Sequence, residues 1–136
     1  MGRILAIDYG AKRVGLAVTD PLQIIATALT TVPEKEVIDF LKNYIITENV
    51  ERFVVGMPLS LNGDDTHATP LVKAFIKRLQ KTFPNVPVDT EDEQYTSKMA
   101  VQSMVQAGVK KKDRRKKENI DKISATIILQ SYLEHY

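Results

Sequence analysis

Three acidic positions lie where carboxylates could take part in metal binding or catalysis. Asp8 ends an apolar run over residues 3–8, the Glu-Asp-Glu triplet at 91–93 ends a second strand-like run, and Asp121 lies near the start of the last predicted helix. A carboxylate at the end of an apolar run is costly to desolvate unless a cation or hydrogen-bond donors compensate it. Carboxylates that converge from separate elements are hard oxygen ligands suited to Mg²⁺ or Mn²⁺. Two such ions about 4 Å apart would activate a water and stabilise the leaving oxygen of a phosphodiester.

Each of these acids also has a purely structural interpretation. Asp8 is suited to cap the turn before Gly10, since Asp is a common turn residue. Asp121, in a first helical turn, would favour the positive end of the helix dipole. In the triplet 91–93, strand alternation places the two glutamates on one face and Asp92 on the other, so alternation alone does not choose between them. The sequence permits convergence of the acids but does not establish it.

The formal net charge of +2 is the sum of two opposite regions. Residues 108–122 hold eight Lys and Arg against three Asp and Glu, a net of +5, while the other 121 residues hold 11 basic and 14 acidic side chains, a net of −3. A basic block beside an acidic remainder is the pattern that a contact with a phosphate backbone would produce. The alternative is a solvated loop with no partner. The predicted phosphate contacts in this block are Lys110, Lys111, Lys112, Arg114 and Arg115.

Three further residues are candidates for holding a nucleic-acid substrate. Lys12 and Arg13 follow Asp8 by four and five residues in a predicted hairpin loop, where they would hold a phosphate or simply form a solvated turn. Thr96 would offer its hydroxyl and a backbone N–H to a phosphate at a helix N-terminus. That role is compatible with plain N-capping by the same residue.

For these residues to act together, strands and helices must bring them to one edge of a sheet. The pattern over residues 3–32 predicts a three-stranded antiparallel meander, with a five-residue loop between its first two strands. Strands that alternate with helices afterwards imply parallel strands with crossovers. The predicted fold is α/β, a mixed five-stranded sheet of three antiparallel and then two parallel strands with helices on both faces. Helices are expected over about 34–48, 66–82, 97–107 and 118–134, and the later strands at 53–55 and from 86–88 into 91–93.

Length and composition exclude several classes of protein. The 136 residues fit one domain, 1–136, that can bury a core without metal or disulfide staples. No cysteine is present, so a disulfide framework, a thiolate metal site and a Cys nucleophile are excluded. No apolar run approaches the roughly 18 residues of a membrane span. A cytoplasmic protein with no membrane partner is the default expectation.

Four segments of the chain resemble the YqgF family of Holliday-junction-resolvase-like proteins, which is also associated with pre-16S rRNA cleavage. Residues 4–20 resemble its opening Asp-x-Gly-x-Lys-Arg signature with the following Gly-x-Ala strand and Thr-Asp pair. Residues 54–63 are similar to its Val-Gly-Leu-Pro-Leu and Asp/Asn-Gly segment, and residues 92–97 to its Asp-Glu-Arg-Leu/Tyr-Thr-Thr segment. Residues 121–129 resemble its closing Asp-x-x-Ala-Ala-x-x-Ile-Leu helix. All four occur in the family's order and spacing.

The resemblance implies an RNase H-like fold and metal-dependent phosphodiester hydrolysis. Asp8, Glu93 and Asp121 would then be the catalytic residues and the ligands of Mg²⁺ or Mn²⁺, with Glu93 preferred to Asp92 because it matches the family's Glu. The substrate would be the precursor of small-subunit ribosomal RNA or a branched DNA, cut by a monomer or homodimer. One departure is Gln94, where the family usually has Arg. Gln brings no charge and no bidentate fork, which weakens the expected hold on substrate near Glu93.

Two other functions are compatible with parts of the pattern. A non-catalytic nucleic-acid-binding factor in transcription or ribosome assembly would use the same basic block, and its salt-sensitive binding would survive loss of any of the three acids. A phosphotransferase with an actin-like phosphate loop also carries Asp-x-Gly before a hairpin. That architecture binds nucleotide between two such domains, and this chain has the length of one.

Overall fold

A computed structural model describes residues 2–58, 69–92 and 117–135, with the side chains of 117–123 and 135 left out of the description. The strands are β1 (Arg3–Tyr9), β2 (Arg13–Thr19), β3 (Ala26–Pro33), β4 (Val50–Met57) and β5 (Val88–Asp92). The helices are the 3₁₀ helix η1 (Glu34–Glu36) and the α-helices α1 (Val37–Thr47), α2 (Thr69–Thr82) and α5 (Lys117–His135). None of the described helices has the combined length and apolar character that a membrane crossing requires.

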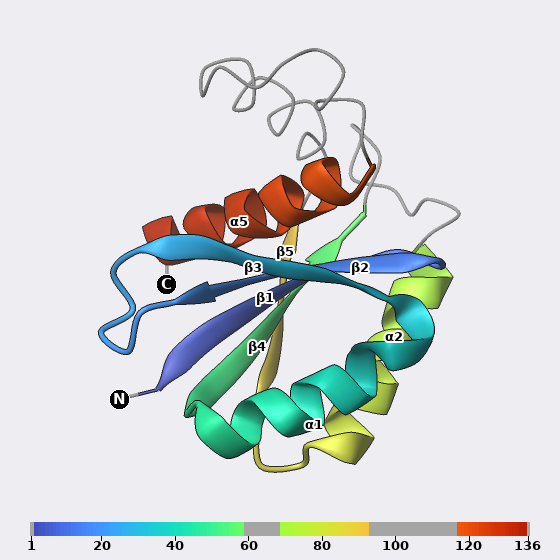
Figure 1. Ribbon diagram of the computed structural model, residues 1–136, viewed down its shortest axis with the longest axis horizontal. Helices are drawn as coiled ribbons and strands as arrows, with labels where there is room; N and C mark the ends of the chain where they lie inside the picture. The colour runs from blue at the N-terminus through green and yellow to red at the C-terminus, as the bar shows by residue number, and fades with distance from the viewer. Residues whose placement is uncertain (1, 59–68, 93–116, 136) are drawn as a thin grey trace.

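The five strands form one mixed sheet in the order β3-β2-β1-β4-β5, as Figure 1 shows. β1, β2 and β3 pair antiparallel, whereas β4 runs parallel to β1 and β5 parallel to β4. Short connections after β1 and β2 allow antiparallel neighbours, and the longer connections that contain α1 and α2 allow parallel ones. The predicted fold class is therefore confirmed, including the meander and the two parallel strands.

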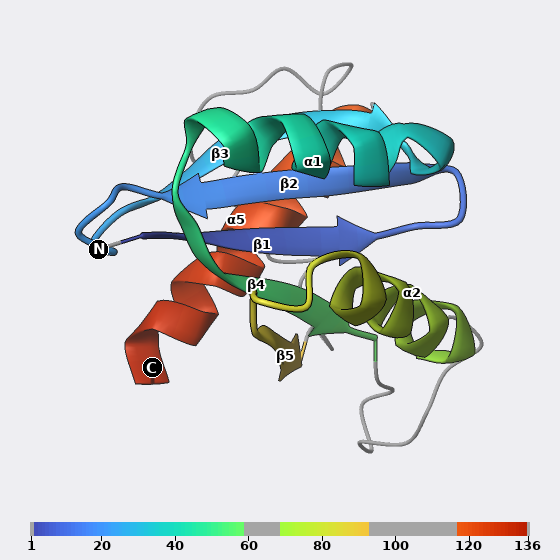
Figure 2. The same ribbon diagram turned by 90° about the horizontal axis from the view of Figure 1, so that it is seen from below.

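Helices cover both faces of this sheet (Figure 2). Along β1, Leu5 and Ile7 pack in the cluster that includes residues of α1 and α2. Ile4 and Ala6, on the opposite face of the same strand, pack in the cluster that includes residues of α5. Because both faces of β1 are covered, its residues Ile4–Ile7 are fully buried, which explains the continuous apolar run in the sequence.

The element bounds differ from the predicted ones where polar residues take part in regular structure. β4 is longer than the predicted 53–55, because it begins at Val50 and pairs with β1 through Arg52. The first hairpin loop is three residues rather than five, since β1 continues to Tyr9 and β2 begins at Arg13. The predicted helix at 97–107 lies outside the described residues.

A loop separates β2 from β3, which begins at Ala26. Asp20 organises this loop, because its Oδ1 accepts hydrogen bonds of 2.8 Å from the backbone N–H groups of Ile24 and Ile25. Its Oδ2 accepts a third from Leu22 at 3.1 Å. These hydrogen bonds lower the pKa of Asp20, the bond from Ile25 contributing most. Gln23 adopts a positive φ of 61° within the loop.

Candidate active site

Asp8 lies next to the end of the central strand, on the face of the sheet that α5 covers. Ile4 and Ala6 belong to the cluster beneath α5, and alternation places the next residue of this series, Asp8, on the same face. The Asp8 side chain is half-buried, unlike the fully buried run before it. Since β1, β4 and β5 are mutually parallel, all three end at this same edge. The expected location of Asp8 at a carboxyl edge is therefore what the backbone shows.

A glycine on β4 lies beside Asp8 in the sheet. The pairing of β1 with β4 reaches Ile7 opposite Val55, so one step further Asp8 lies beside Gly56. Gly56 in turn pairs with Glu91 on β5. Neighbouring strands are about 4.8 Å apart, so Asp8 and Glu91 stand on strands about 10 Å apart with no side chain on the strand between them. The row formed by Asp8, Gly56 and Glu91 was not predicted, because it follows from strand register.

A contact between β5 and α5 shows which residues of β5 face the same way as Asp8. The Tyr132 hydroxyl of α5 donates a 2.8 Å hydrogen bond to Oδ2 of Asp89, so Asp89 and, two residues on, Glu91 lie on the α5 face. Asp92 lies on the opposite face and is exposed. The sequence left the choice within 91–93 open, and the structure places Asp92 away from Asp8. Glu93 itself lies outside the described residues.

Position 121 lies on α5 at the same end of the molecule. α5 begins on the side of the sheet where β1 ends and the hairpin to β2 turns (Figure 1). One turn further along, Ser124 and Ala125 are buried against the sheet, 1% and 0% exposed. The backbone therefore brings the elements that carry positions 8 and 121, and the strand leading to 93, to one edge. Among the described side chains no group of three Asp, Glu, His or Cys residues is placed to hold a metal ion.

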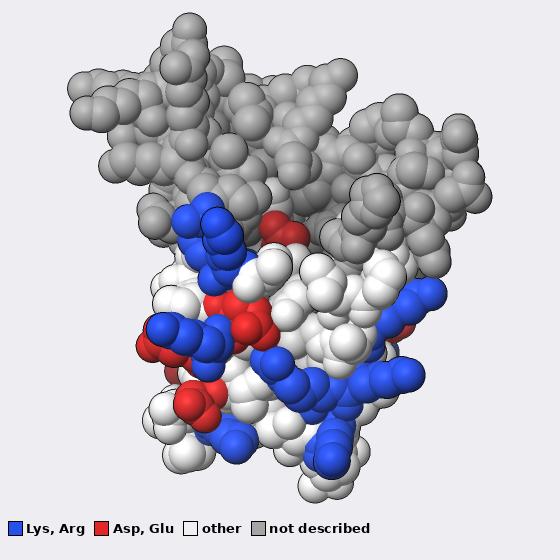
Figure 3. All heavy atoms as spheres, turned by 90° about the vertical axis from the view of Figure 1, so that its right-hand side faces the viewer, with Lys and Arg blue, Asp and Glu red and all other residues white. Residues whose placement is uncertain are grey.

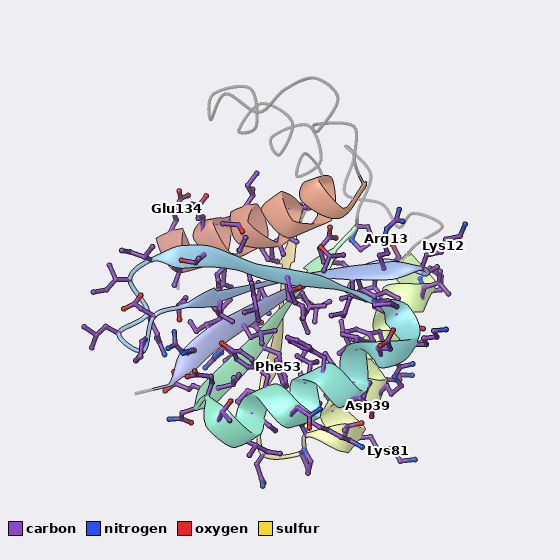
Figure 4. The ribbon with its side chains drawn as sticks, in the orientation of Figure 1. Lys12, Arg13, Asp39, Phe53, Lys81 and Glu134 are labelled. Carbon is purple, nitrogen blue, oxygen red and sulfur yellow. The ribbon has the colours of Figure 1, made fainter. Side chains whose placement is uncertain are left out.

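The hairpin after Asp8 places two cations at this edge, which Figure 4 labels. Arg13 is half-buried and shares the α5 face with Gly15, which pairs with Asp8. Lys12 is exposed at the tip of the hairpin. Gly10 makes this turn possible, because a Cβ at that position would lie 2.6 Å from the carbonyl oxygen of Arg13.

Glu34 of η1 holds the hairpin and β1 in place from the other face. Its backbone N–H donates to the carbonyl oxygen of Lys12 at 2.9 Å, and its Oε1 accepts from the Tyr9 hydroxyl at 3.1 Å. The Tyr9 ring stacks on Phe75 of α2 with 4.3 Å between centroids. Burial first, and then the Glu34 carboxylate, raise the pKa of Tyr9 above its ordinary value. Tyr9, the residue next to Asp8, is thus held on the opposite face of the sheet from Asp8.

The other predicted substrate contacts lie outside the described residues. These are Thr96, Lys110, Lys111, Lys112, Arg114 and Arg115, so their roles stay predictions. The basic helix α2 was not among the predicted substrate contacts. α2 holds four cations and no acid, a bias that counting charges helix by helix would have revealed.

The chain is similar to one family of known proteins over nearly its whole length. Residues 2–135 match the family model RuvX, described as Holliday junction resolvase. A protein of Amoebophilus asiaticus named "Putative pre-16S rRNA nuclease" is 57% identical over 136 residues, which are 100% of this chain and 96% of that protein. Proteins with the same name from Bacteroides fragilis and Porphyromonas gingivalis are 51% and 50% identical, and the matches span 98% and 99% of this chain and 97% and 98% of theirs.

Among solved structures, Thermus thermophilus RuvC in complex with a Holliday junction substrate is similar in fold. The TM-score is 0.58 at 15% identity, covering 98% of this chain and 94% of that one. At this identity the likeness concerns the RNase H-like fold alone. The family model and the full-length relatives carry the assignment: the chain belongs to the RuvX family, the YqgF family that its four sequence segments resemble.

Proposed function

We propose that this chain is a metal-dependent endonuclease that hydrolyses phosphodiester bonds during maturation of the 5′ end of pre-16S rRNA. The observation that carries the proposal is the position of Asp8, on the α5 face of the central strand at the edge where α5 begins. Full-length relatives named for pre-16S rRNA cleavage support the choice of substrate. The enzyme would act as a single domain in the cytoplasm.

The proposed metal ligands are Asp8, Glu93 and Asp121, which would hold two Mg²⁺ or Mn²⁺ ions. The donor chemistry fits, because carboxylates on three separate elements supply the hard oxygen ligands that these ions prefer. Gly56 supports this fit by leaving the space beside Asp8 free of a side chain on β4. When bound, the ions would supply an activated water and stabilise the leaving oxygen, so no covalent intermediate with the protein is required.

The chain's own cations would orient the substrate. Arg13 shares the face of Asp8, and its guanidinium has the planar donor geometry that binds a phosphate through two hydrogen bonds. Lys12, exposed at the hairpin tip, would hold a neighbouring phosphate as a point charge. Thr96 and the basic residues of 110–115 are proposed as further contacts to the backbone. Substrate binding and metal binding would thus share one edge of the sheet.

Replacing Asp8 with Asn tests the proposal. The change keeps the size of the side chain and removes its charge, so hydrolysis of a pre-16S rRNA fragment with Mg²⁺ or Mn²⁺ should fall at least about a hundredfold. The matched control is Asp39→Asn on α1, an exposed aspartate on the opposite face of the sheet, which should cleave at the wild-type rate (Figure 4).

A four-way DNA junction serves as the second substrate in the same assay. Faster cleavage of the junction than of the RNA would move the substrate assignment to branched DNA. Undiminished cleavage by the Asp8→Asn protein would overturn the catalytic assignment. Nucleic-acid binding without any metal-dependent cleavage would instead identify a non-catalytic binding factor.

A further inference from the structure

The two helices that cover the same face of the sheet differ in charge. α2, residues 69–82, carries Lys73, Lys77, Arg78 and Lys81 and no acid, a net of +4. The segment 34–47, which forms η1 and α1, carries two lysines and three glutamates or aspartates, a net of −1. Figure 3 shows Lys and Arg side chains at the left as well as over the right and lower part of this side of the molecule, whereas the acidic side chains lie mainly to the left. The basic character therefore belongs to α2.

Three of these cations form an exposed row along α2. Lys73, Lys77 and Lys81 are spaced four residues apart, so they span about 12 Å along the helix within an arc of about 80°. We call these three residues the lysine row. All three are exposed, whereas the buried face of α2 consists of Thr69, Val72, Phe75 and Leu79. The row therefore faces away from the core.

The fourth cation of α2, Arg78, contacts a carboxylate and an aromatic ring. Nη2 of Arg78 lies 3.1 Å from Oε1 of Glu34, and its guanidinium carbon lies 5.4 Å from the centroid of the Phe75 ring. Among the described residues, neither Lys77 nor Lys81 forms such an ion pair. These two positive charges are consequently not neutralised within the described part of the chain.

The lysine row starts at the same edge of the sheet as the candidate active site, on the opposite face. The hydroxyl of Thr69 donates a 2.8 Å hydrogen bond to the carbonyl oxygen of Pro58, which fixes the start of α2 at the end of β4. Phe75, between the first two lysines, stacks on Tyr9, the neighbour of Asp8. From the edge that carries Lys12, the row then runs along α2 toward the opposite end of the sheet.

We propose that the lysine row of α2 binds the sugar–phosphate backbone of the substrate beyond the cleaved bond. This inference rests on the proposed nuclease function and extends the contact surface from the hairpin along α2. The ligand class follows from the side chains, because ammonium groups act as point charges for phosphates. The exposed positions of α2 include no aromatic residue that would stack on a base, so binding here is independent of base sequence.

The test compares two double variants that each remove two exposed lysines. Lys77→Gln with Lys81→Gln removes half of the net charge of α2, and Lys35→Gln with Lys42→Gln removes the same number from η1 and α1. Binding of a labelled pre-16S rRNA fragment is measured by fluorescence anisotropy without divalent metal, so that no cleavage occurs. The dependence of the binding constant on salt concentration is recorded for each protein.

The α2 variant should bind about tenfold more weakly at 0.1 M salt, and its log–log salt slope should be shallower by about 1.4 to 1.8, which is 0.7 to 0.9 per lost phosphate contact. The variant of Lys35 and Lys42 should keep the wild-type slope. Equal slopes for wild type and the α2 variant, or equal losses in both variants, would overturn the inference. If the variants show these differences in binding but the protein shows no metal-dependent cleavage, the α2 binding surface is supported and the nuclease function is contradicted.

Discussion

At the residue scale, the environment of Asp8 depends on a two-residue alternation that runs the length of β1. Ile4 and Ala6 are buried under α5, and Asp8 is the next residue on that face but is only half-buried. The strand therefore carries a carboxylate to the edge of the core without burying it completely, which limits the cost of its desolvation. Tyr9, on the other face, is held by Phe75 and Glu34.

Replacing Gly10 should have the most local effect on this edge of the sheet. A Cβ at position 10 would lie 2.6 Å from the carbonyl oxygen of Arg13, so Gly10→Ala must displace the hairpin backbone. We expect a loss of about 1–3 kcal/mol in the free energy of unfolding, measured by urea denaturation. Cleavage should fall as well, because Lys12 and Arg13 move with the backbone.

Ala11→Ser is the matched control in the same turn, since Ala11 is exposed. Its free energy of unfolding should stay within about 0.5 kcal/mol of wild type. If the proteins with Gly10→Ala and Ala11→Ser unfold at the same urea concentration, the turn does not require a glycine at position 10.

At the element scale, a polar contact at the far end of α5 ties this helix to the sheet. The Tyr132 hydroxyl donates to Oδ2 of Asp89 on β5 at 2.8 Å, and Nη1 of Arg52 on β4 donates to the Tyr132 oxygen at 3.2 Å. α5 carries Asp121 near its other end, and β5 leads to Glu93. The contact therefore connects two of the elements on which the proposed metal ligands lie.

Tyr132→Phe should weaken this connection while preserving the packing of the ring. Loss of the hydrogen bond to a partly exposed carboxylate should cost about 1 kcal/mol of unfolding free energy at pH 7. Burial first, and then Asp89, raise the pKa of Tyr132 to about 12. Because the folded-state pKa is raised, this stabilisation is present below the ordinary pKa of 10.0 and is lost as the pH rises through about 12.

Denaturation curves at pH 7 and pH 11 measure both effects. The wild type should lose more stability between these pH values than the Tyr132→Phe protein does. Tyr44→Phe on α1 is the control at pH 7, because the described structure contains no hydrogen bond from the Tyr44 hydroxyl and the expected change is within about 0.5 kcal/mol. Identical stabilities of wild type and Tyr132→Phe at pH 7 would show that the contact does not hold α5.

At the scale of the whole molecule, the fold was predictable because its signals are local. Short loops and alternating residues indicate the meander, and helices between later strands indicate the parallel pairs, which the sheet order confirms. The length of β4 was underestimated, because Glu51 and Arg52 are polar positions in a strand whose pairing with β1 is set by tertiary structure. A sequence pattern does not contain that pairing.

The candidate site was predictable only in part for the same reason. That Asp8 lies at a carboxyl edge followed from the order of elements, whereas the faces of Glu91 and Asp92 required the contact between Asp89 and Tyr132. That Gly56 lies between Asp8 and Glu91 depends on the register of three strands. The net positive charge of α2 can be counted in the sequence. The predicted phosphate contacts were placed in the larger basic block at 108–122.

The convergence of Asp8, Glu93 and Asp121 on metal ions is tested most directly by Mn²⁺ binding, measured by electron paramagnetic resonance. Wild-type protein should bind Mn²⁺ saturably, and Asp8→Asn, Glu93→Gln and Asp121→Asn should each weaken binding by about tenfold or more, since even changes around the direct ligands cost that much. Asp39→Asn should bind as wild type does. Wild-type affinity in the Asp8→Asn protein would contradict a metal site at this edge of the sheet.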